Sequence, residues 1–354
     1  MTCTASDQCH VAGTCDPQTG LCSNPVAPDG AGCDDGDACT PTDTCQAGTC
    51  TSGNPVTCTA SDECHVAGTC DSSSGVCSNP NAPDGIYCST GICETGACYV
   101  PTLSFQASQS YAAGNRPAGV ATGDVNGDGN RDLVVINVVG ADASVLLGNG
   151  DGTLTAAAPV GGIGTNPGGV ALADLDGDGK LDLLVGGFNV PGIGGLRVLL
   201  GNGDGTFQAP VLYAVGNQPT SVQVADFNGD GKLDVVTSNF VGSSLSVLLG
   251  NGDGTLQSAT NYSAPGANTP NDVAVADVNG DGKLDLISAN ANGQTLSVWL
   301  GNGDGTFQPA IVFPSGGSFP DAVAVGDLNG DGKLDLATTN YFANTVSVLI
   351  NQSF

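Results

Sequence analysis

The sequence predicts an all-β protein, a five-bladed β-propeller with N-terminal strand closure, preceded by small disulfide-rich modules with little regular structure. Two observations lead to this fold class. All fifteen cysteines lie between Cys3 and Cys98, and an acidic loop of nine residues recurs five times in the remainder of the chain. We therefore expect tandem cysteine modules over residues 1–100, forming a stalk, and a propeller over residues 101–354.

The cysteines are arranged in four modules, with about five residues between most neighbouring cysteines. The modules that begin at Cys3 and Cys58 are near copies of each other. Segments with so few large apolar residues cannot bury a core alone, which favours a disulfide scaffold. Zinc is the alternative, and it is disfavoured because CxxC pairs are absent. The only two histidines, His10 and His65, occupy equivalent positions, and only the zinc interpretation would use them.

The number of cysteines is odd because the last module, from Cys88 to Cys98, lacks the segment that would contain the equivalent of Cys39. One thiol should therefore lack its usual partner. We expect an altered pairing, an intermolecular bridge or a free thiol. Met1 stands where the third module has Val56, so we also expect the natural polypeptide to extend upstream through more cysteine modules and a secretion signal.

The acidic loops begin at Asp124, Asp174, Asp226, Asp277 and Asp327, which lie 50, 52, 51 and 50 residues apart. A regular period of about fifty residues indicates one supersecondary unit copied in series. Oxygen donors stand at loop positions 1, 3, 5 and 9, position 7 can offer its backbone carbonyl, and glycines at positions 4 and 6 permit a tight wrap. This donor set predicts about five bound Ca²⁺ ions, one per blade.

Each copy also contains four short strand candidates, which are DVAVADV, LDLISAN, TLSVWLG and TFQPAIVFP in the fourth copy. Alternating apolar residues predict strands with one face in a core. The recurring GNGDGT segments predict hairpin turns, with their aspartates as turn residues and a second calcium set as the alternative. The fifth copy ends after its third strand, and LSFQASQSYAAGNRP from Leu103 matches the fourth strand of another copy. This N-terminal strand should complete the last blade and remove its exposed edge.

The copies resemble FG-GAP or VCBS-type repeats, the blades of integrin α-subunit-like propellers, over residues 103–354. The resemblance implies a calcium loop between the first two strands of each blade. Integrin-like propellers commonly have seven blades, so a count of five departs from them. The implied metal ligands, with position 7 acting through its carbonyl, are Asp124, Asn126, Asp128, Asn130 and Asp132; Asp174, Asp176, Asp178, Lys180 and Asp182; Asp226, Asn228, Asp230, Lys232 and Asp234; Asp277, Asn279, Asp281, Lys283 and Asp285; Asp327, Asn329, Asp331, Lys333 and Asp335.

Composition excludes several classes of function. The chain has 35 acidic residues against seven Lys and Arg, and five Ca²⁺ ions would change its formal charge from -28 to -28 + 10 = -18. This charge argues against nucleic acid and anionic membranes as partners. No segment approaches the eighteen apolar residues of a membrane span, so we expect no membrane insertion. The predicted propeller has no His and no Glu, and no catalytic motif is present, so we expect no enzymatic activity.

The propeller face opposite the acidic loops varies most between copies. Phe188, Phe240 and Tyr341 stand there at matched positions, and Asn239 and Asn340 precede two of them. An exposed aromatic beside Asn suits a sugar contact, although Asn is also a good turn residue and the aromatics can cap a blade. We expect a secreted or cell-surface calcium-binding adhesion or recognition protein that binds an extracellular glycan or protein ligand. The alternative is a structural surface or matrix component that assembles with copies of itself, with calcium purely structural.

Overall fold

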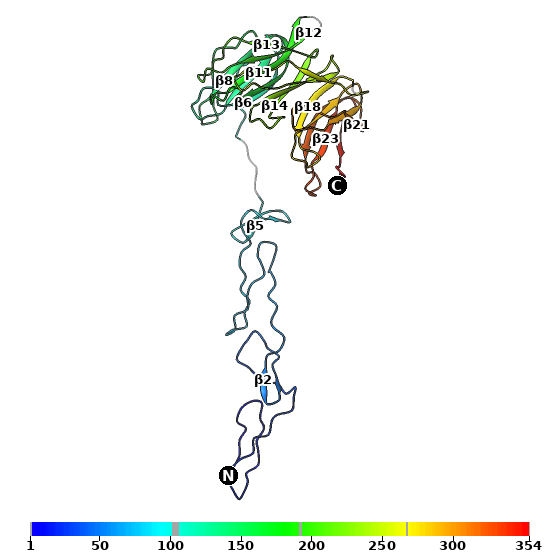
Figure 1. Cartoon of the computed structure of the whole chain (residues 1–354). Helices are drawn as coiled ribbons and strands as arrows, with labels where there is room; N and C mark the ends of the chain where they lie inside the picture. Colours follow the sequence, from blue (N-terminus) through cyan, green and yellow to red (C-terminus); the bar gives the residue numbers. More distant parts are fainter. Residues whose placement is uncertain (1, 101–105, 191–192, 267, 354) are drawn as a thin grey trace. The chain divides into compact units, whose positions relative to one another are not determined.

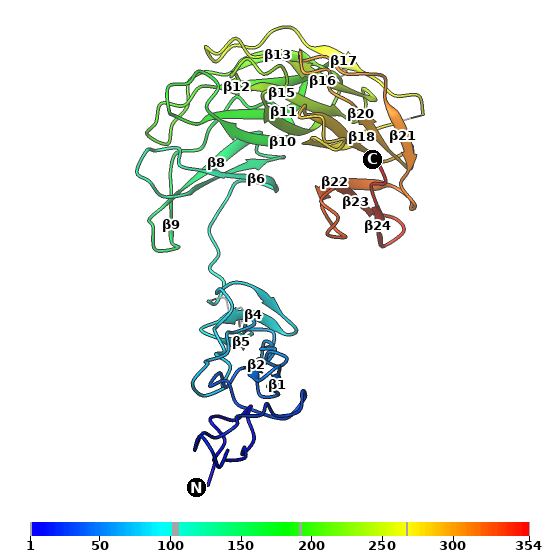
Figure 2. The same cartoon turned by 60° about the horizontal axis from the view of Figure 1, so that its bottom comes forward.

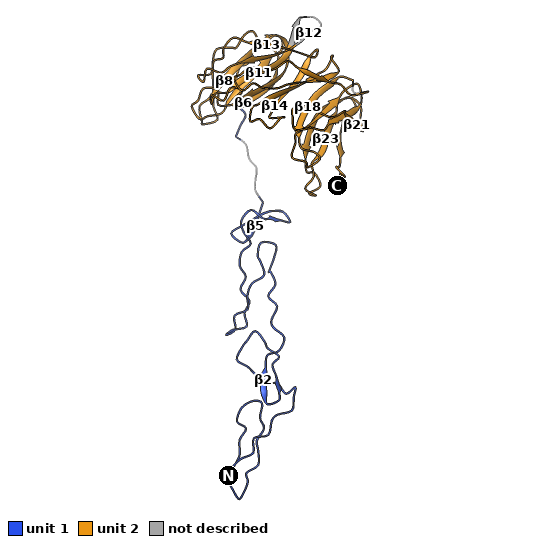
Figure 3. Cartoon of the chain, viewed as in Figure 1, with its two compact units in different colours: residues 1–108 blue, residues 109–354 orange. Residues whose placement is uncertain are grey.

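The computed structural model describes residues 2–100, 106–190, 193–266 and 268–353, and the side chains of residues 188–190, 193 and 194 lie outside this description. Strands are the only regular elements among the described residues (Figure 1). Accordingly, no helix in this part of the chain has the length and apolar character that a membrane span requires. The chain divides into two compact units, residues 1–108 and 109–354 (Figure 3).

The first unit is held together by disulfides and has little regular structure. Five short strands among its described residues form a two-stranded and a three-stranded sheet: β1 (Thr44–Gln46) with β2 (Thr49–Thr51), and β3 (Tyr87–Cys88) with β4 (Gly91–Glu94) and β5 (Ala97–Tyr99). Fourteen cysteines form the seven disulfides Cys3–Cys22, Cys9–Cys45, Cys33–Cys50, Cys39–Cys70, Cys58–Cys77, Cys64–Cys93 and Cys88–Cys98. The prediction of cysteine-rich, disulfide-bonded modules is confirmed.

The described residues of the second unit form five successive antiparallel sheets (Figure 2). Four sheets have four strands and the fifth has three. The strands of the first two sheets are β6 (Pro117–Gly123), β7 (Asp132–Asn137), β8 (Asp142–Gly148), β9 (Leu154–Ala156), then β10 (Thr165–Ala173), β11 (Asp182–Val190), β12 (Ile193–Leu199) and β13 (Val211–Val215). Those of the last three are β14 (Pro219–Ala225), β15 (Asp234–Asn239), β16 (Ser244–Leu248), β17 (Thr260–Tyr262), then β18 (Pro270–Ala276), β19 (Asp285–Asn290), β20 (Thr295–Trp299), β21 (Ile311–Pro314), then β22 (Pro320–Gly326), β23 (Asp335–Asn340) and β24 (Thr345–Leu349).

Successive sheets pack face to face, and one hydrophobic cluster fills each of the four contacts between them. Between the third and fourth sheets, for example, Leu245 and Val247 of β16 share a cluster with Val273 of β18. Alternating apolar residues on each strand supply these faces, because side chains in a strand point alternately to opposite sides. Repeated four-stranded β units are thus confirmed.

The predicted closure by an N-terminal strand is absent from the described residues. β24 pairs only with β23, and residues 106–112 form no strand, while 103–105 of the predicted strand lie outside the description. The outer faces of the end sheets are also uncovered. Val346 of β24 is 65% exposed, whereas Leu245 and Leu296, its equivalents in the third and fourth sheets, are fully buried. Each interior face is covered by the neighbouring sheet, whereas none of the described residues packs as a further sheet on the fifth.

Candidate functional site

All five acidic loops connect the first strand of a sheet to its second strand, and they share one local geometry. In the fourth sheet, Asp277 Oδ1 accepts the backbone N–H groups of Gly280 at 2.7 Å and Asp281 at 3.1 Å, and its Oδ2 accepts that of Gly282 at 2.7 Å. The other four loops repeat these bonds at 2.7–3.3 Å. Gly280 and Gly282 have φ values of 75° and 82°, a backbone conformation that glycine adopts without strain.

The ninth residue of each loop is a buried aspartate that opens the second strand. Asp285 is fully buried, and it accepts the backbone N–H of Val278 on Oδ2 at 3.0 Å and that of Gly301 on Oδ1 at 2.8 Å. The same two bonds, at 2.7–2.9 Å, are made by Asp132, Asp182, Asp234 and Asp335. These carboxylates tie each loop to the end of the third strand.

The loop of the second sheet brings three carboxylates together. One oxygen from each of Asp174, Asp176 and Asp182 lies within 4.8 Å of the other two. Burial, with the charges of neighbouring aspartates, raises the pKa of Asp176 and of Asp182. Burial likewise raises the pKa of Asp234 and Asp285 in their loops. Closely spaced carboxylate oxygens repel one another and are the ligands that Ca²⁺ prefers, so this donor set fits such a cation.

The carboxylate of the fifth residue in the second loop, Asp178, contacts a lysine as well as the carboxylate of Asp176. Asp178 Oδ2 accepts a hydrogen bond from Lys180 Nζ at 2.7 Å, and this contact, with the backbone N–H of Lys180, lowers the pKa of Asp178. In the first loop, the backbone N–H of Asn130 and the Asn126 side chain lower the pKa of Asp128. The carboxylates of Asp128 and Asp178 are therefore held in their charged form.

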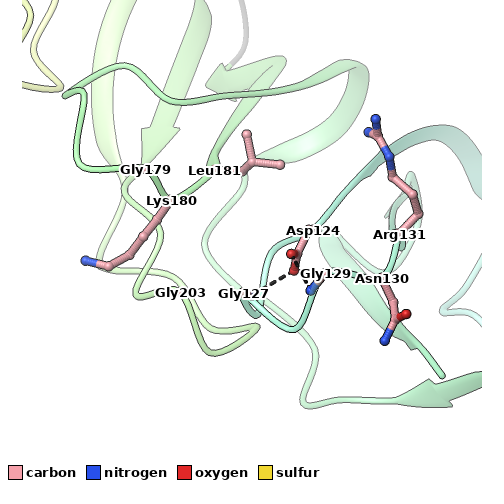
Figure 4. Close-up of a pocket in the computed structure, with 9 residues that line it drawn as sticks. All are labelled: Asp124, Gly127, Gly129, Asn130, Arg131, Gly179, Lys180, Leu181 and Gly203. Carbon is pink, nitrogen blue, oxygen red and sulfur yellow. Dashed lines mark hydrogen bonds between the residues drawn. The ribbon is translucent and has the colours of Figure 1, made fainter. Parts of the chain in front are cut away.

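A pocket of about 450 Å³ lies between the first and second acidic loops (Figure 4). It is lined by Asp124, Asn130 and Arg131 from one loop and by Lys180 and Leu181 from the next. The carboxylate of Asp124 turns toward glycines of its own loop. This pocket lies on the acidic-loop face, whereas we expected the ligand on the opposite one.

The GNGDGT turns use their aspartates to stabilise the turn itself. Asp253 Oδ1 accepts the backbone N–H of Thr255 at 3.0 Å and also the Thr255 hydroxyl. These two bonds lower the pKa of Asp253, with the hydroxyl contact contributing most. The corresponding aspartates Asp151, Asp204 and Asp304 make the same pair of bonds. Their geometry is that of turn residues.

Three aromatic rings gather at the opposite end of the fifth sheet, which we call the aromatic group: Phe319, Tyr341 and Phe342. Ring centroids lie 4.9 Å apart for Phe319 and Phe342, and 5.1 Å apart for Tyr341 and Phe342. Tyr341 is 64% and Phe342 67% exposed. The sequence analysis did not single out Phe319, although it stands directly before the proline of the first strand. The residues at this position in the other copies are Arg116, Asn166, Gln218 and Thr269.

The proposed asparagine contacts are corrected by the structure. Asn239 is fully buried and Asn340 is 1% exposed, so neither can reach a ligand. Asn239 donates from Nδ2 to Ser244 and Ser246 and accepts the Thr237 hydroxyl at 3.0 Å. Asn239 pairs with hydroxyl groups inside the sheet because its strand, β15, is buried along its whole length. Asn340 donates from Nδ2 to the hydroxyls of Thr345 and Ser347. Phe240 is half-buried, and the side chain of Phe188 lies outside the described residues.

Repeated four-stranded sheets, each with an acidic loop between its first two strands, define a class of tandem β-repeat proteins. The FG-GAP-like repeat family matches residues 124–185, 188–237, 238–288 and 277–338, more than half of the chain. The chain belongs to the FG-GAP-like repeat family.

Solved structures are similar at low identity. A lectin from Agrocybe aegerita, described for its specific recognition of non-reducing terminal N-acetylglucosamine, is 21% identical, with 67% of this chain and 68% of that chain covered and a TM-score of 0.43. A functionally unknown protein from Desulfotomaculum acetoxidans is 12% identical, with 67% and 70% covered and a TM-score of 0.48. The periplasmic gluconolactonase of Pseudomonas aeruginosa is 16% identical, with 67% and 72% covered and a TM-score of 0.44. No curated protein matches the chain.

Proposed function

We propose that this chain is an extracellular, calcium-binding recognition protein, secreted or displayed at a cell surface, whose FG-GAP unit binds a glycan or protein ligand without catalysing a reaction. In this proposal each of the five sheets is one blade of a propeller-type unit. The observation that carries the calcium part is the recurrence of one loop geometry in five places, with converging carboxylates in the second loop.

The ion would be held by loop positions 1, 3, 5 and 9 and by the carbonyl of position 7. Bound Ca²⁺ supplies positive charge that offsets the repulsion among these carboxylates. The chain itself arranges the donors, because the first aspartate wraps the loop through three backbone N–H groups and the ninth ties it to the sheet. Calcium therefore has a structural role in this proposal, and the aspartates of the loops are not used as acids or bases.

The aromatic group supports a recognition role. Three clustered rings, two of them about two-thirds exposed, form an apolar patch on a strongly acidic protein. Exposed aromatic clusters are favoured at binding surfaces because a ring supplies a large contact area with little loss of conformational entropy. A sugar ring or an apolar side chain of a protein ligand would stack on such a surface.

Seven disulfides support an extracellular location, because oxidising compartments maintain such bonds and the cytosol reduces them.

A binding screen tests the recognition function. Disulfide-intact protein is applied to glycans and extracellular matrix components in millimolar Ca²⁺, and each hit is repeated with the variant Tyr341→Ser/Phe342→Ser. The control is Val241→Ser, which changes the 53% exposed residue at the position equivalent to Phe342 in the third sheet. We expect the double variant to lose a hit that the control keeps. Hits that survive the double variant, or none from folded protein, would contradict recognition by the aromatic group.

A further inference from the structure

Cys15 is the one cysteine of the described residues that forms no disulfide. Its equivalent in the near-copy module, 55 residues further along, is Cys70. Cys70 is bonded to Cys39, which belongs to the module before it. In the near-copy module, the cysteine at this position is therefore bonded to a cysteine of the preceding module.

The remaining disulfides match in pairs between the two halves of the cysteine array. Cys3–Cys22 corresponds to Cys58–Cys77, Cys9–Cys45 to Cys64–Cys93, and Cys33–Cys50 to Cys88–Cys98. Only Cys39–Cys70 has no counterpart. The missing counterpart is a bond between Cys15 and the equivalent of Cys39 in an added module.

The C-terminal end of the array requires no such partner. The last module lacks the segment that would hold the equivalent of Cys39, so it presents no linking thiol to a following module. Every cysteine from Cys58 to Cys98 is paired within the chain. The linking chemistry is therefore complete at one end of the array and incomplete at Cys15.

The backbone turn after Cys15 repeats the turn after Cys70, which is docked against the preceding module. Beside the Cys39–Cys70 bond, Ala38 donates its backbone N–H to the carbonyl of Ser72 at 2.8 Å, and the Cβ position of Gly75 lies 2.9 Å from the Ala38 carbonyl oxygen. The equivalent of Gly75 is Gly20, whose φ of 67° nearly equals the 69° of Gly75. Apart from Gly20 and its two chain neighbours, no described residue has a heavy atom within 4 Å of the Cβ position of Gly20.

The residues that would meet an incoming module are compatible with it. Pro17 replaces Ser72, and proline keeps the carbonyl, which is the only atom of Ser72 that the contact uses. Cys22 is exposed where its equivalent Cys77 is half-buried, as expected if a neighbouring module covers this face. The same backbone conformation thus presents the same acceptor, open to solvent.

We propose that Cys15 is a docking cysteine, which forms a disulfide with the equivalent of Cys39 in another cysteine module of the type seen at residues 33–50. That module can belong to an upstream segment of the same polypeptide or to a second chain. In the reaction, the two thiols lose two protons and two electrons to a low-molecular-weight disulfide such as oxidised glutathione, which is reduced to two thiols. The product is one inter-module S–S bond.

The test adds one module pair to the full chain. A second copy of residues 3–57 is inserted ahead of Cys3, with Gln18→Ser in the added copy so that its peptides can be distinguished. Both chains are oxidised in a glutathione buffer, alkylated and mapped without reduction. In the 354-residue chain, alkylation should map to Cys15. In the extended chain, Cys15 should be bonded to the added Cys39, and alkylation should move to the added copy of Cys15.

A matched control replaces the added Cys39 by Ser, which should return alkylation to Cys15 while the original seven disulfides stay unchanged. Alkylation of Cys15 in the extended chain, or its pairing with any other cysteine, would overturn the proposal. Native protein then distinguishes the two sources. A partner in the same polypeptide leaves one chain after reduction, a partner in a second chain releases a separate mass, and a freely alkylated Cys15 in native protein also overturns the proposal.

Discussion

Asp234 Oδ1 accepts the backbone N–H of Gly250 at 2.7 Å, which joins the acidic loop of the third sheet to the turn after its third strand. Asp234 Oδ2 accepts the backbone N–H of Phe227 at 2.9 Å, and all three residues are buried. Aspartates of the ninth loop position therefore organise the sheet through their own hydrogen bonds, in addition to any contact with a cation.

Substitution of Asp234 should destabilise the FG-GAP unit even without calcium. Asp234→Ala leaves two buried N–H groups without acceptors, which should lower the free energy of unfolding by about 2 to 5 kcal/mol. The measurement is denaturant unfolding in excess chelator. Asp230→Ala is the control in the same loop, because the exposed Asp230 carboxylate accepts the backbone N–H of Lys232 and lies 4.0 Å from its Nζ, with no bond to a buried N–H. Equal stability of the two variants in chelator would show that the ninth position has no structural role of its own.

Removal of calcium should lower the melting temperature of the intact protein. Extracellular calcium modules bind with a Kd near 10⁻⁴ to 10⁻³ M, so each loop should contribute roughly 1 kcal/mol at millimolar Ca²⁺. For a unit of this size, five such loops correspond to a shift of roughly 10 to 20 °C. Thermal melts with and without chelator measure the shift, and calorimetric titration should give about five ions per chain. An identical melt in calcium and in chelator would exclude structural calcium sites.

Substitution of Asn239 should lower the stability of the fold and should not remove a ligand contact. Asn239→Ala removes hydrogen bonds to Thr237, Ser244 and Ser246 inside the third sheet, which should lower the free energy of unfolding by about 1 to 3 kcal/mol. The control is Asn251→Ala, since Asn251 is exposed and its side chain bonds only to the Thr255 hydroxyl at 2.8 Å. If Asn239→Ala unfolds at the same denaturant concentration as the control, the buried network contributes nothing.

Phe319→Gly should leave the stability of the fold intact and should weaken ligand binding, because the ring is lost. Phe319 and Gln218 both have a φ of 58°, where glycine is less strained than a residue with a Cβ. Phe319→Gly and the control Gln218→Gly should therefore be as stable as the unmodified protein, or more stable by up to about 1 kcal/mol. Only Phe319→Gly should weaken binding of a ligand found in the screen. A much lower melting temperature for Phe319→Gly than for Gln218→Gly would instead assign the ring a structural role.

Much of the β architecture was readable in the sequence because its signals are local. Alternation of apolar residues in the third strands, such as Leu245 and Val247, predicted one buried face, and both side chains are buried. The Asn-Gly and Asp-Gly pairs predicted turns because glycine there needs a positive φ, and Gly252 and Gly254 have φ values of 77° and 78°. In each case a few neighbouring residues carry the whole signal.

The candidate recognition residues were predicted less well because exposure depends on packing between distant segments. Asn239 ends a strand whose six residues are all buried, so its polar side chain is turned into a hydrogen-bond network that the local sequence does not reveal. Tyr341 is exposed, but its ring neighbour Phe319 lies 22 residues earlier in the chain. The Phe319–Tyr341 ring contact, with centroids 6.0 Å apart, exists because the N–H of Tyr341 bonds to the carbonyl of Phe319 at 2.9 Å.

The sequence by itself determined the repeat, the loop chemistry and the use of cysteines as a disulfide scaffold, since composition and short spacing carry these properties. Only the tertiary structure decided that Cys15 is the unpaired cysteine and that the end sheets keep open faces. Both properties depend on which cysteine module or which sheet lies beside another in space. Cys70 is bonded because Cys39 of a preceding module reaches it, and Leu296 is buried because a fifth sheet covers it, whereas the equivalent Val346 meets no following sheet.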